Sequence, residues 1–354
     1  MRKPTIAAID LFCGAGGLAY GLRKAGISVI AGLDLDPACE FPFTRNNHAP
    51  FLERDVRLLK GSDLAELYPK DFTRLLAGCA PCQPFSPYSR GSDSRTHRDW
   101  GLLAEFARLV VELKPELVTM ENVPGLGSKP IFRRFVASLE RVGYDVKFRS
   151  VYCPPLGIPQ HRRRLVLLAS RIGEVRVPTG ALQAEEFHTV REAIGTLPPL
   201  SSGESDREDR LHRARATSKL NLRRLRASVP GGSWKDWDKE LRLPCHRKRT
   251  GSSYRNVYGR MNWDDPSPTI TTQSFNFGTG RFGHPDQDRS ITPREAAVLQ
   301  TFPRRYRFVH PREPLYLARV SRLIGNAVPP QLGYHIGREL VRVAKKHAGR
   351  KAQL

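Results

Sequence analysis

The chain has 354 residues, of which 40% are hydrophobic, and it carries 58 Lys and Arg against 35 Asp and Glu, a formal net charge of +23. The length suggests two domains, and the apolar content is sufficient for a core. So large an excess of cations favours nucleic acid as a partner, because Lys and Arg displace counterions from phosphates, although a basic surface can also serve solubility alone. No apolar run reaches the roughly 18 residues of a membrane span, and the six cysteines lack a small-scaffold spacing. We therefore expect a protein of the reducing cytoplasm, without a membrane segment or a disulfide framework.

The first half of the chain alternates between strand and helix patterns. Short apolar runs predict buried strands at residues 5–10, 28–34, 74–78, 117–121 and 164–169. Helical periodicity predicts helices at residues 17–25, 100–113 and 131–141. Strands separated by helices are typical of βαβ units, so the sequence predicts an α/β fold with a doubly wound, mainly parallel sheet.

The alternation stops after about residue 170. Residues 198–210, rich in Pro, Ser and charge, are expected to form a linker or an exposed loop. Residues 201–260 hold 16 Lys and Arg against 7 Asp and Glu, and Trp234, Trp237 and Trp263 lie in or just beyond this basic stretch. Basic residues interleaved with aromatics suit a nucleic-acid surface, but the same aromatics could form the core of a small domain. Regular structure should resume near Thr292, and residues 331–346 predict a basic C-terminal helix.

A glycine-rich turn follows the first predicted strand. Residues 10–17 read DLFCGAGG, and an acid, Asp34, ends the second strand. Glycines let the backbone turn tightly and leave room for a ligand, and a carboxylate about 20 residues further on can bind ribose hydroxyls. The pattern fits NAD, FAD or S-adenosylmethionine, or a purely structural turn. The spacing departs from G-x-G-x-x-G, which disfavours a dinucleotide.

Two cysteines, Cys79 and Cys82, follow the predicted strand at residues 74–78. They could form a redox pair or, less well because no second pair stands at ligand spacing, half of a zinc site. Alternatively, one of them is a nucleophile at the carboxyl edge of a parallel sheet. Glu121 ends the next strand and should reach the same edge, where a carboxylate hinders disulfide chemistry but can act as a general acid. Residues 160–164, QHRRR, add guanidinium groups that can hold a carbonyl oxygen or contact phosphate.

Taken in order, six segments resemble the motifs of the bacterial-type cytosine-5 DNA methyltransferase family. They are residues 10–17 (DLFCGAGG), 81–83 (PCQ), 121–123 (ENV), 160–164 (QHRRR), 289–295 (RSITPRE) and 325–330 (GNAVPP). Only about residues 187–284 lie outside them, where the family has its variable target-recognition domain. The resemblance implies a Rossmann-like methyltransferase fold, with a catalytic domain of residues 1–185 and 286–354 and a smaller, irregular target-recognition domain of residues 186–285.

The same resemblance implies a reaction. A methyl group passes from S-adenosylmethionine to carbon 5 of a cytosine flipped out of a specific short double-stranded DNA sequence. Cys82 would be the nucleophile that adds to carbon 6, and Glu121 the acid at ring nitrogen 3. Arg162 and Arg164 would hold the cytosine oxygen and the carboxylate. Cys79 has no matching role and is expected to be a small buried filler.

Further site residues follow from the resemblance. Phe12 would lie against the adenine and Asp34 would hold the ribose, while Leu35 stands where relatives often have an aromatic residue. The implied cofactor-binding residues are Asp10, Phe12, Gly14, Gly16, Asp34, Asp55, Pro81, Asn326 and Val328. The implied DNA-binding residues are Gln83, Ser86, Arg90, Arg247, Lys248 and Arg249. We expect no metal, a monomer that binds double-stranded DNA at the bacterial nucleoid, and a cognate restriction endonuclease as a functional partner.

Three other functions stay open. An RNA cytosine-5 methyltransferase could use the same scaffold, but the sizeable basic insert favours DNA, since duplex base edges must be read in the grooves. A DNA-binding protein with an inactive catalytic domain is disfavoured by the intact Cys82, Glu121 and arginines. A redox protein that uses Cys79 and Cys82 would leave the charge and the other motifs unexplained.

Overall fold

A computed structural model describes residues 6–81, 101–248 and 257–351. The chain forms two compact units. The first consists of Met1–Leu156, Arg163–Gly180 and Ala327–Leu354, and the second of Gly157–Arg162 and Ala181–Asn326. The predicted target-recognition domain, residues 186–285, falls within the second unit. Its boundaries, drawn where the family's motifs end and begin again, stay a prediction.

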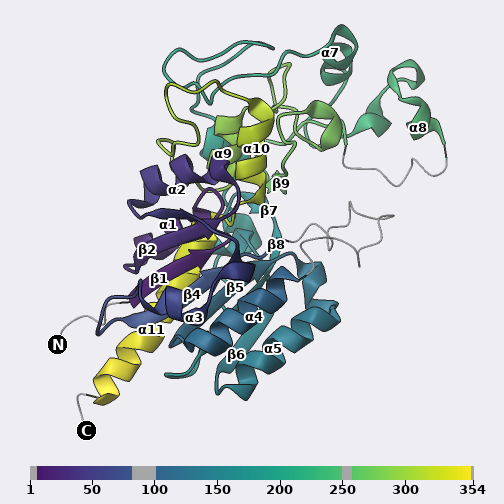
Figure 1. Cartoon of the computed structure of the whole chain (residues 1–354). Coiled ribbons are helices and arrows are strands. Elements are labelled where there is room, and N and C mark those ends of the chain that lie inside the picture. Colours follow the sequence, from purple (N-terminus) through teal and green to yellow (C-terminus); the bar gives the residue numbers. More distant parts are fainter. Residues whose placement is uncertain (1–5, 82–100, 249–256, 352–354) are drawn as a thin grey trace. The chain divides into compact units, whose positions relative to one another are not determined.

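A seven-stranded sheet in the order β3-β2-β1-β4-β5-β8-β6 is the centre of the first unit (Figure 1). Five strands run parallel: β1 (Ile6–Leu11), β2 (Ser28–Asp34), β3 (Phe51–Glu53), β4 (Thr73–Gly78) and β5 (Leu117–Asn122). β8 (Arg163–Ser170) is antiparallel to both of its neighbours, β5 and β6 (Asp145–Tyr152). The predicted α/β fold with a mainly parallel sheet is therefore confirmed, and each of the predicted strands is present to within one residue at either end.

Helices cover both faces of this sheet. The chain leaves β1 through α1 (Gly17–Lys24) toward β2, and reaches β5 through α4 (Leu102–Leu113) in the opposite direction. Because parallel crossovers are right-handed, these two directions put α1 and α4 on opposite faces. α5 (Pro130–Arg141) packs beside α4, as Figure 1 shows. The main core, which includes Phe106 and Phe135, lies between these two helices and the sheet. Two further helices of this unit are α2 (Glu40–Asn47) and α3 (Gly61–Ala65).

The C-terminal helix α11 (Pro330–Lys351) packs against α1 and contains the predicted helix at residues 331–346. The two backbones approach so closely that a Cβ atom on Gly21 would lie 2.2 Å from the carbonyl oxygen of Pro330. A Cβ atom on Gly333 would lie 2.9 Å from the carbonyl oxygen of Leu18. Glycine is therefore required at Gly21, because real side chains do not approach a backbone atom at that distance. This contact holds the C-terminal part of the chain against the helix that follows the glycine-rich turn.

The second unit contains short helices joined by long irregular segments. Its strands β7 (Gln160–His161) and β9 (Ser267–Pro268) pair over two residues. Its helices are α6 (Val190–Ile194), α7 (Lys219–Arg226), α8 (Pro244–Arg247), α9 (Pro293–Leu299) and α10 (Leu317–Asn326). Throughout the described ranges, no helix has both the length and the apolar character needed to cross a membrane.

A helix, α9, begins directly after Thr292, as predicted, but regular structure is not confined to the part of the chain beyond it, because α6, α7 and α8 come earlier. The Thr292 hydroxyl accepts a hydrogen bond from the backbone N–H of Glu295 and caps α9. Glu295 forms a fully buried ion pair with Arg289 at 2.8 Å. Burial would raise the pKa of Glu295, but its bonds to Arg289 prevail and lower it. The RSITPRE segment at residues 289–295 thus builds a buried, charged anchor for α9.

Candidate active site

The strand order places a candidate site at the carboxyl ends of β1 and β4. In the sheet, β2 and β3 lie on one side of β1, whereas β4 and β5 lie on its other side, so the direction in which successive strands are added changes between β1 and β4. Open α/β sheets bind their ligands at such a switch point. The glycine-rich loop follows β1, and residues 79–81 follow β4. The predicted cofactor and nucleophile segments therefore begin at the same edge of the sheet.

The glycine-rich loop has an unusual backbone. Phe12, Gly14 and Gly16 all have positive φ angles, of 57°, 53° and 84°. This conformation is easy for glycine, but it costs a residue such as Phe12 about 1–2 kcal/mol. The backbone N–H of Gly14 donates to Asp34 Oδ2 at 2.9 Å, which fixes the loop to the end of β2. A Cβ atom on Gly14 would meet no atom of the described residues within 4 Å, so the described part of the chain leaves room beside the loop.

Two carboxylates accompany this loop. Asp10 is 1% exposed, and neither of its oxygens accepts a hydrogen bond of normal geometry from the described residues. Burial raises the pKa of Asp10 to about 7, although the nearby backbone N–H of Ala19 offsets part of the shift. Burial also raises the pKa of Asp34, against the hydrogen bonds that it accepts from the backbone of Asp36 and Gly14. The loop is therefore accompanied by one buried acid, Asp10, and one half-buried acid, Asp34.

The remaining predicted cofactor residues are dispersed. Asp55 forms an ion pair with Arg57 at 2.5 Å, so its carboxylate is already engaged. Pro81 is half-buried, and Val328 is buried in the first unit. Asn326 ends α10 in the second unit and is exposed. Their contacts with a cofactor stay predictions.

Strand register brings three polar side chains together beyond the loop. Gly78 pairs with Met120 in parallel strands, so Cys79 comes level with Glu121. On the other side of β5, Glu121 pairs with Val166 of the antiparallel β8. Arg164 lies two residues from Val166 and therefore shares its face of the sheet, within reach of a long side chain. Because β8 runs in reverse, its first residues lie at the carboxyl edge of the parallel strands.

Glu121 is the centre of this group. It is 3% exposed, and its Oε1 lies 2.9 Å from Nε of Arg164 in an ion pair that lacks the alignment of a hydrogen bond. The thiol of Cys79 donates to the other oxygen, Oε2, at 2.8 Å. The register thus places a buried carboxyl group, held by a cation and by a neutral donor, at the edge where a base would bind, and a carboxyl group is a side chain that can act as a general acid.

Cys79 is not the small buried filler that was expected. Its side chain is half-buried and bonds to Glu121. The expectation was wrong because it rested on the residues around Cys79 in the sequence. The partner of Cys79 is Glu121, which comes from the adjacent strand β5. The sequence placed both residues at the ends of predicted strands, but the register of β4 against β5, which brings them together, is visible only in the sheet.

Several predicted residues lie outside the described ranges. They are Cys82, Gln83, Ser86, Arg90 and Arg249. The described segment before Cys82 is anchored on both sides. The backbone N–H of Cys79 donates to the Leu11 carbonyl at 3.3 Å, and Asn122 Nδ2 donates to the Ala80 carbonyl at 2.9 Å. The chain therefore enters the PCQ segment from a fixed position next to Glu121.

Comparison with known proteins decides the family. The family model of the C-5 cytosine-specific DNA methylases matches residues 6–342. The chain belongs to this family. It is 48% identical over 339 residues to the Type II methylase M.HgiDII of Herpetosiphon aurantiacus, with 95% of each chain covered. It is 32% identical over 354 residues to the Type II methyltransferase M1.BsuMI of Bacillus subtilis, with 94% of this chain and 80% of the relative covered.

A solved structure shows the same fold. A putative DNA modification methyltransferase encoded within a prophage (E. coli) covers 96% of this chain and 100% of its own, with a TM-score of 0.70 and 22% identity. The resemblance drawn from the motifs and the Rossmann-like methyltransferase fold are therefore both confirmed. The chain is an enzyme, a DNA cytosine-5 methyltransferase.

Arg162 of this methyltransferase is placed differently from Arg164. It belongs to the second unit and is 1% exposed. Its Nη1 donates at 3.2 Å both to Oε1 of Gln160 and to the carbonyl of Ile270, and its Nη2 donates to the carbonyl of Gly325 at 3.5 Å. These bonds tie the QHRRR and GNAVPP segments together. They give Arg162 a structural role, and its predicted contact with cytosine stays a prediction.

Two tryptophans of the basic stretch, residues 201–260, belong to a hydrophobic core cluster. Trp234 and Trp237 are buried with Leu225, Leu241 and Phe277. The small-domain interpretation of these aromatics is therefore correct for this pair. Trp263 differs, because it is only half-buried and its Nε1 donates to Asp286 at 2.6 Å.

The predicted DNA contacts of the stretch are exposed where they are described. Arg247 ends α8, and its Nη2 donates to the carbonyl of Lys239 at 2.9 Å. Lys248 follows, and both residues are exposed. This exposure leaves their cationic groups accessible to phosphates, and DNA contact by them stays a prediction.

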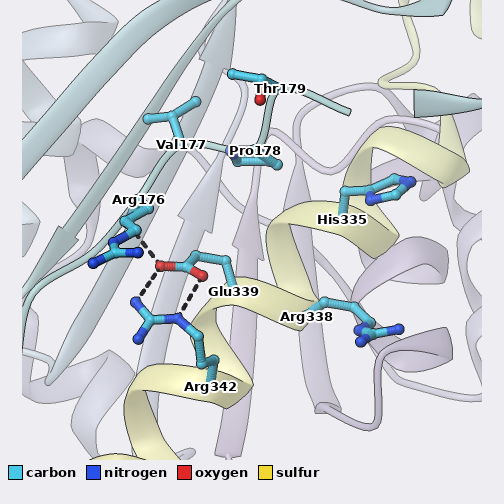
Figure 2. Close-up of a pocket in the computed structure, with 8 residues that line it drawn as sticks. All are labelled: Arg176, Val177, Pro178, Thr179, His335, Arg338, Glu339 and Arg342. Atoms are coloured by element: carbon cyan, nitrogen blue, oxygen red, sulfur yellow. Dashed lines mark hydrogen bonds and ion pairs between the residues drawn. The ribbon is translucent and has the colours of Figure 1, made fainter. Parts of the chain in front are cut away.

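A pocket of about 430 Å³ elsewhere in the first unit has different chemistry (Figure 2). Residues 176–179 and α11 form its wall, and Glu339 lies between Arg176 and Arg342. Glu339 accepts from the Arg176 backbone N–H at 2.7 Å and from the Arg342 guanidinium at 2.6 and 2.8 Å, which balances its charge within the wall. No predicted catalytic or cofactor residue lines it. Within the described residues, no group of three or more His, Cys, Asp or Glu side chains could hold a metal ion.

Proposed function

We propose that this enzyme transfers a methyl group from S-adenosylmethionine to carbon 5 of a flipped-out cytosine, through a covalent bond between Cys82 and carbon 6. The observation that carries the proposal is the buried Glu121, held by Arg164 and Cys79 at the sheet edge where the PCQ segment begins. A cytosine attacked by Cys82 would need an acid at ring nitrogen 3, and Glu121 is the residue that we propose for it. A redox pair of Cys79 and Cys82 is disfavoured, because the Cys79 thiol donates a hydrogen bond to the Glu121 carboxylate, and a neighbouring carboxylate disfavours the thiolate that disulfide exchange needs.

The residues around the glycine-rich loop fit S-adenosylmethionine. Among the described residues, none comes within 4 Å of a Cβ atom placed on Gly14, and none donates a hydrogen bond of normal geometry to the buried Asp10 carboxylate. Both findings are expected where a ligand brings donors or positive charge. Asp34 stands where ribose hydroxyls would be held, and Leu35, 51% exposed, offers apolar surface next to it. Phe12, Gly16, Asp55, Pro81, Asn326 and Val328 complete the proposed set. When bound, this cofactor supplies the methyl group in an electrophilic form.

The chain's own residues then make carbon 5 reactive. The Cys82 thiolate adds to carbon 6, and the electron pair of the 5–6 double bond becomes available at carbon 5. Glu121 gives a proton to ring nitrogen 3, which accommodates the density that the addition pushes there. Arg164 holds the Glu121 carboxylate, and a guanidinium group can also hold the cytosine oxygen. After methylation a base removes the carbon-5 proton, the double bond forms again, the Cys82 thiolate leaves, and the nitrogen-3 proton returns to Glu121.

The substrate that we propose is a short, specific sequence of double-stranded DNA. The chemistry requires the cytosine to leave the stack, at a cost of a few kcal/mol. Residues 186–285 would supply most of the base recognition, and Gln83, Ser86, Arg90, Arg247, Lys248 and Arg249 would contact DNA. The names of the relatives specify Type II methylases, which supports a restriction-modification role with a cognate endonuclease. We propose a monomer that works without a metal in the bacterial cytoplasm.

Two linked experiments test this proposal. Bisulfite sequencing of DNA from cells that express the protein should reveal 5-methylcytosine in one short context. A duplex with 5-fluorocytosine at that mapped position should then form a denaturation-resistant adduct, because fluorine cannot be removed from carbon 5 as a proton is. The adduct should require S-adenosylmethionine and be absent in Cys82→Ser, while Glu121→Gln should form it more slowly. Methylation of the mapped site without any adduct on the fluorinated duplex would refute the covalent mechanism.

A further inference from the structure

Both oxygens of the Glu121 carboxylate are held, and by different strands. Arg164, on β8, lies 2.9 Å from Oε1, and the thiol of Cys79, just beyond β4, donates to Oε2 at 2.8 Å. β5, which carries Glu121, lies between these two strands in the sheet. A carboxylate held at one oxygen can still turn about its last side-chain bond, whereas two contacts from opposite sides fix the plane of the group.

The Cys79 contact is rigid because its backbone has little freedom. The backbone N–H of Cys79 donates to the carbonyl of Leu11 at the end of β1. On the preceding residue, Gly78, a Cβ atom would lie 2.9 Å from the ring of Phe106, so β4 is tightly packed at this end. On the following residue, the Ala80 carbonyl accepts from Asn122 at 2.9 Å. The backbone is thus fixed at Cys79 and on both sides of it, and this limits where the thiol can lie.

We infer that Cys79 is a positioning residue for the catalytic acid, an inference that rests on the proposed function of Glu121. Its thiol orients the Glu121 carboxyl group toward ring nitrogen 3 of the flipped cytosine. A thiol suits this task because it is a neutral donor, so it fixes an oxygen of Glu121 without adding a second cation beside Arg164. The two cysteines of the C-x-x-C segment therefore have separate duties, orientation of the acid by Cys79 and nucleophilic attack by Cys82.

The test is a double-mutant cycle between Cys79 and Glu121, measured as single-turnover methylation of the mapped duplex at saturating S-adenosylmethionine. Cys79→Ala should slow methylation about tenfold, a factor that corresponds to about 1.4 kcal/mol and lies within the range for a single hydrogen bond. Cys79→Ser, which keeps a donor, should stay within about threefold of the parent. In a Glu121→Ala background, Cys79→Ala should have no further effect, because the group that it positions is absent. Dissociation constants for the duplex and for S-adenosylmethionine should not change.

Controls separate this inference from a purely structural role. Cys153→Ala removes a fully buried thiol elsewhere in the first unit and should leave the rate and the cycle unchanged. If Cys79→Ala fails to fold in thermal unfolding, Cys79→Val, which fills the volume without a donor, takes its place in the cycle. An equal loss in both Glu121 backgrounds, or no loss at all in the parent background, would overturn the inference while leaving Glu121 as the acid. If instead Glu121→Ala alone methylates at the parental rate, the proposed role of Glu121 fails and the inference fails with it.

Discussion

Replacing Asp10 with Asn should stabilise the ligand-free methyltransferase, and by an amount that grows with pH. Asp10 is 1% exposed, and burial raises its pKa from 3.8 to about 7. Between these two values the unfolded chain releases the Asp10 proton while the folded chain keeps it, so the free energy of unfolding falls as pH rises. Above pH 7 the loss is complete, and the difference of about three pKa units corresponds to about 4 kcal/mol. An Asn side chain has nearly the same shape and does not titrate.

The measurement is urea unfolding of the parent and Asp10→Asn at pH 5 and pH 8. The advantage of Asp10→Asn in free energy of unfolding should be about 3 kcal/mol larger at pH 8, because about two of the three pKa units lie in this interval. Asp71→Asn, which removes an exposed carboxylate of the same unit, is the matched control and should show little change with pH. Asp10→Asn should also bind S-adenosylmethionine more weakly, since the buried charge is proposed to serve the ligand. A difference between parent and variant that is constant with pH would refute the argument, because Asp10 would then keep one charge state over the whole range.

Three further predictions concern the cofactor, the fold and DNA. Asp34→Ala should weaken S-adenosylmethionine binding by about 1–3 kcal/mol in calorimetry, the range for a lost hydrogen bond to a charged group, and unchanged affinity would remove Asp34 from the site. Gly21→Ala should lower the free energy of unfolding by about 1–3 kcal/mol, because the new methyl group would overlap a backbone carbonyl of α11; a stabilised variant would contradict the close approach. Replacing Arg247, Lys248 and Arg249 together by Ala should reduce the slope of log affinity for DNA against log salt by about 0.9 per lost phosphate contact, and an unchanged slope would mean that the cluster faces solvent.

The sequence by itself was sufficient for the fold class and the family. Buried parallel strands are continuous apolar runs, so strands such as β2 and β5 are visible locally, and the helices between them predict a parallel sheet. The glycine-rich turn of residues 10–17 has a local cause as well, because positive φ angles favour glycine. The cap at Thr292 is likewise a short-range pattern, which explains why the start of α9 was predicted correctly.

Strand direction was decided only by the tertiary structure. The apolar run of β8 predicts a buried strand but not its direction, and in the sheet β8 pairs antiparallel to β5. That reversal brings Arg164 to Glu121, although 43 positions separate them in the chain. The short β3 was not predicted, and neither was β6, whose central residues are exposed at the edge of the sheet, because neither presents a continuous apolar run.

Side-chain partners were also beyond the reach of local pattern. Cys79 differs from an inert core cysteine only because the register of β4 against β5 places it beside Glu121. Arg162 and Arg164 look equivalent in the QHRRR segment, yet one is enclosed among carbonyl groups and the other pairs with the acid. A residue's chemistry in the site depends on which groups surround it. Those groups come from strands and turns that are distant in sequence. Residue type and spacing were therefore enough to predict candidate site residues, but the neighbours of each residue were known only from the packed structure.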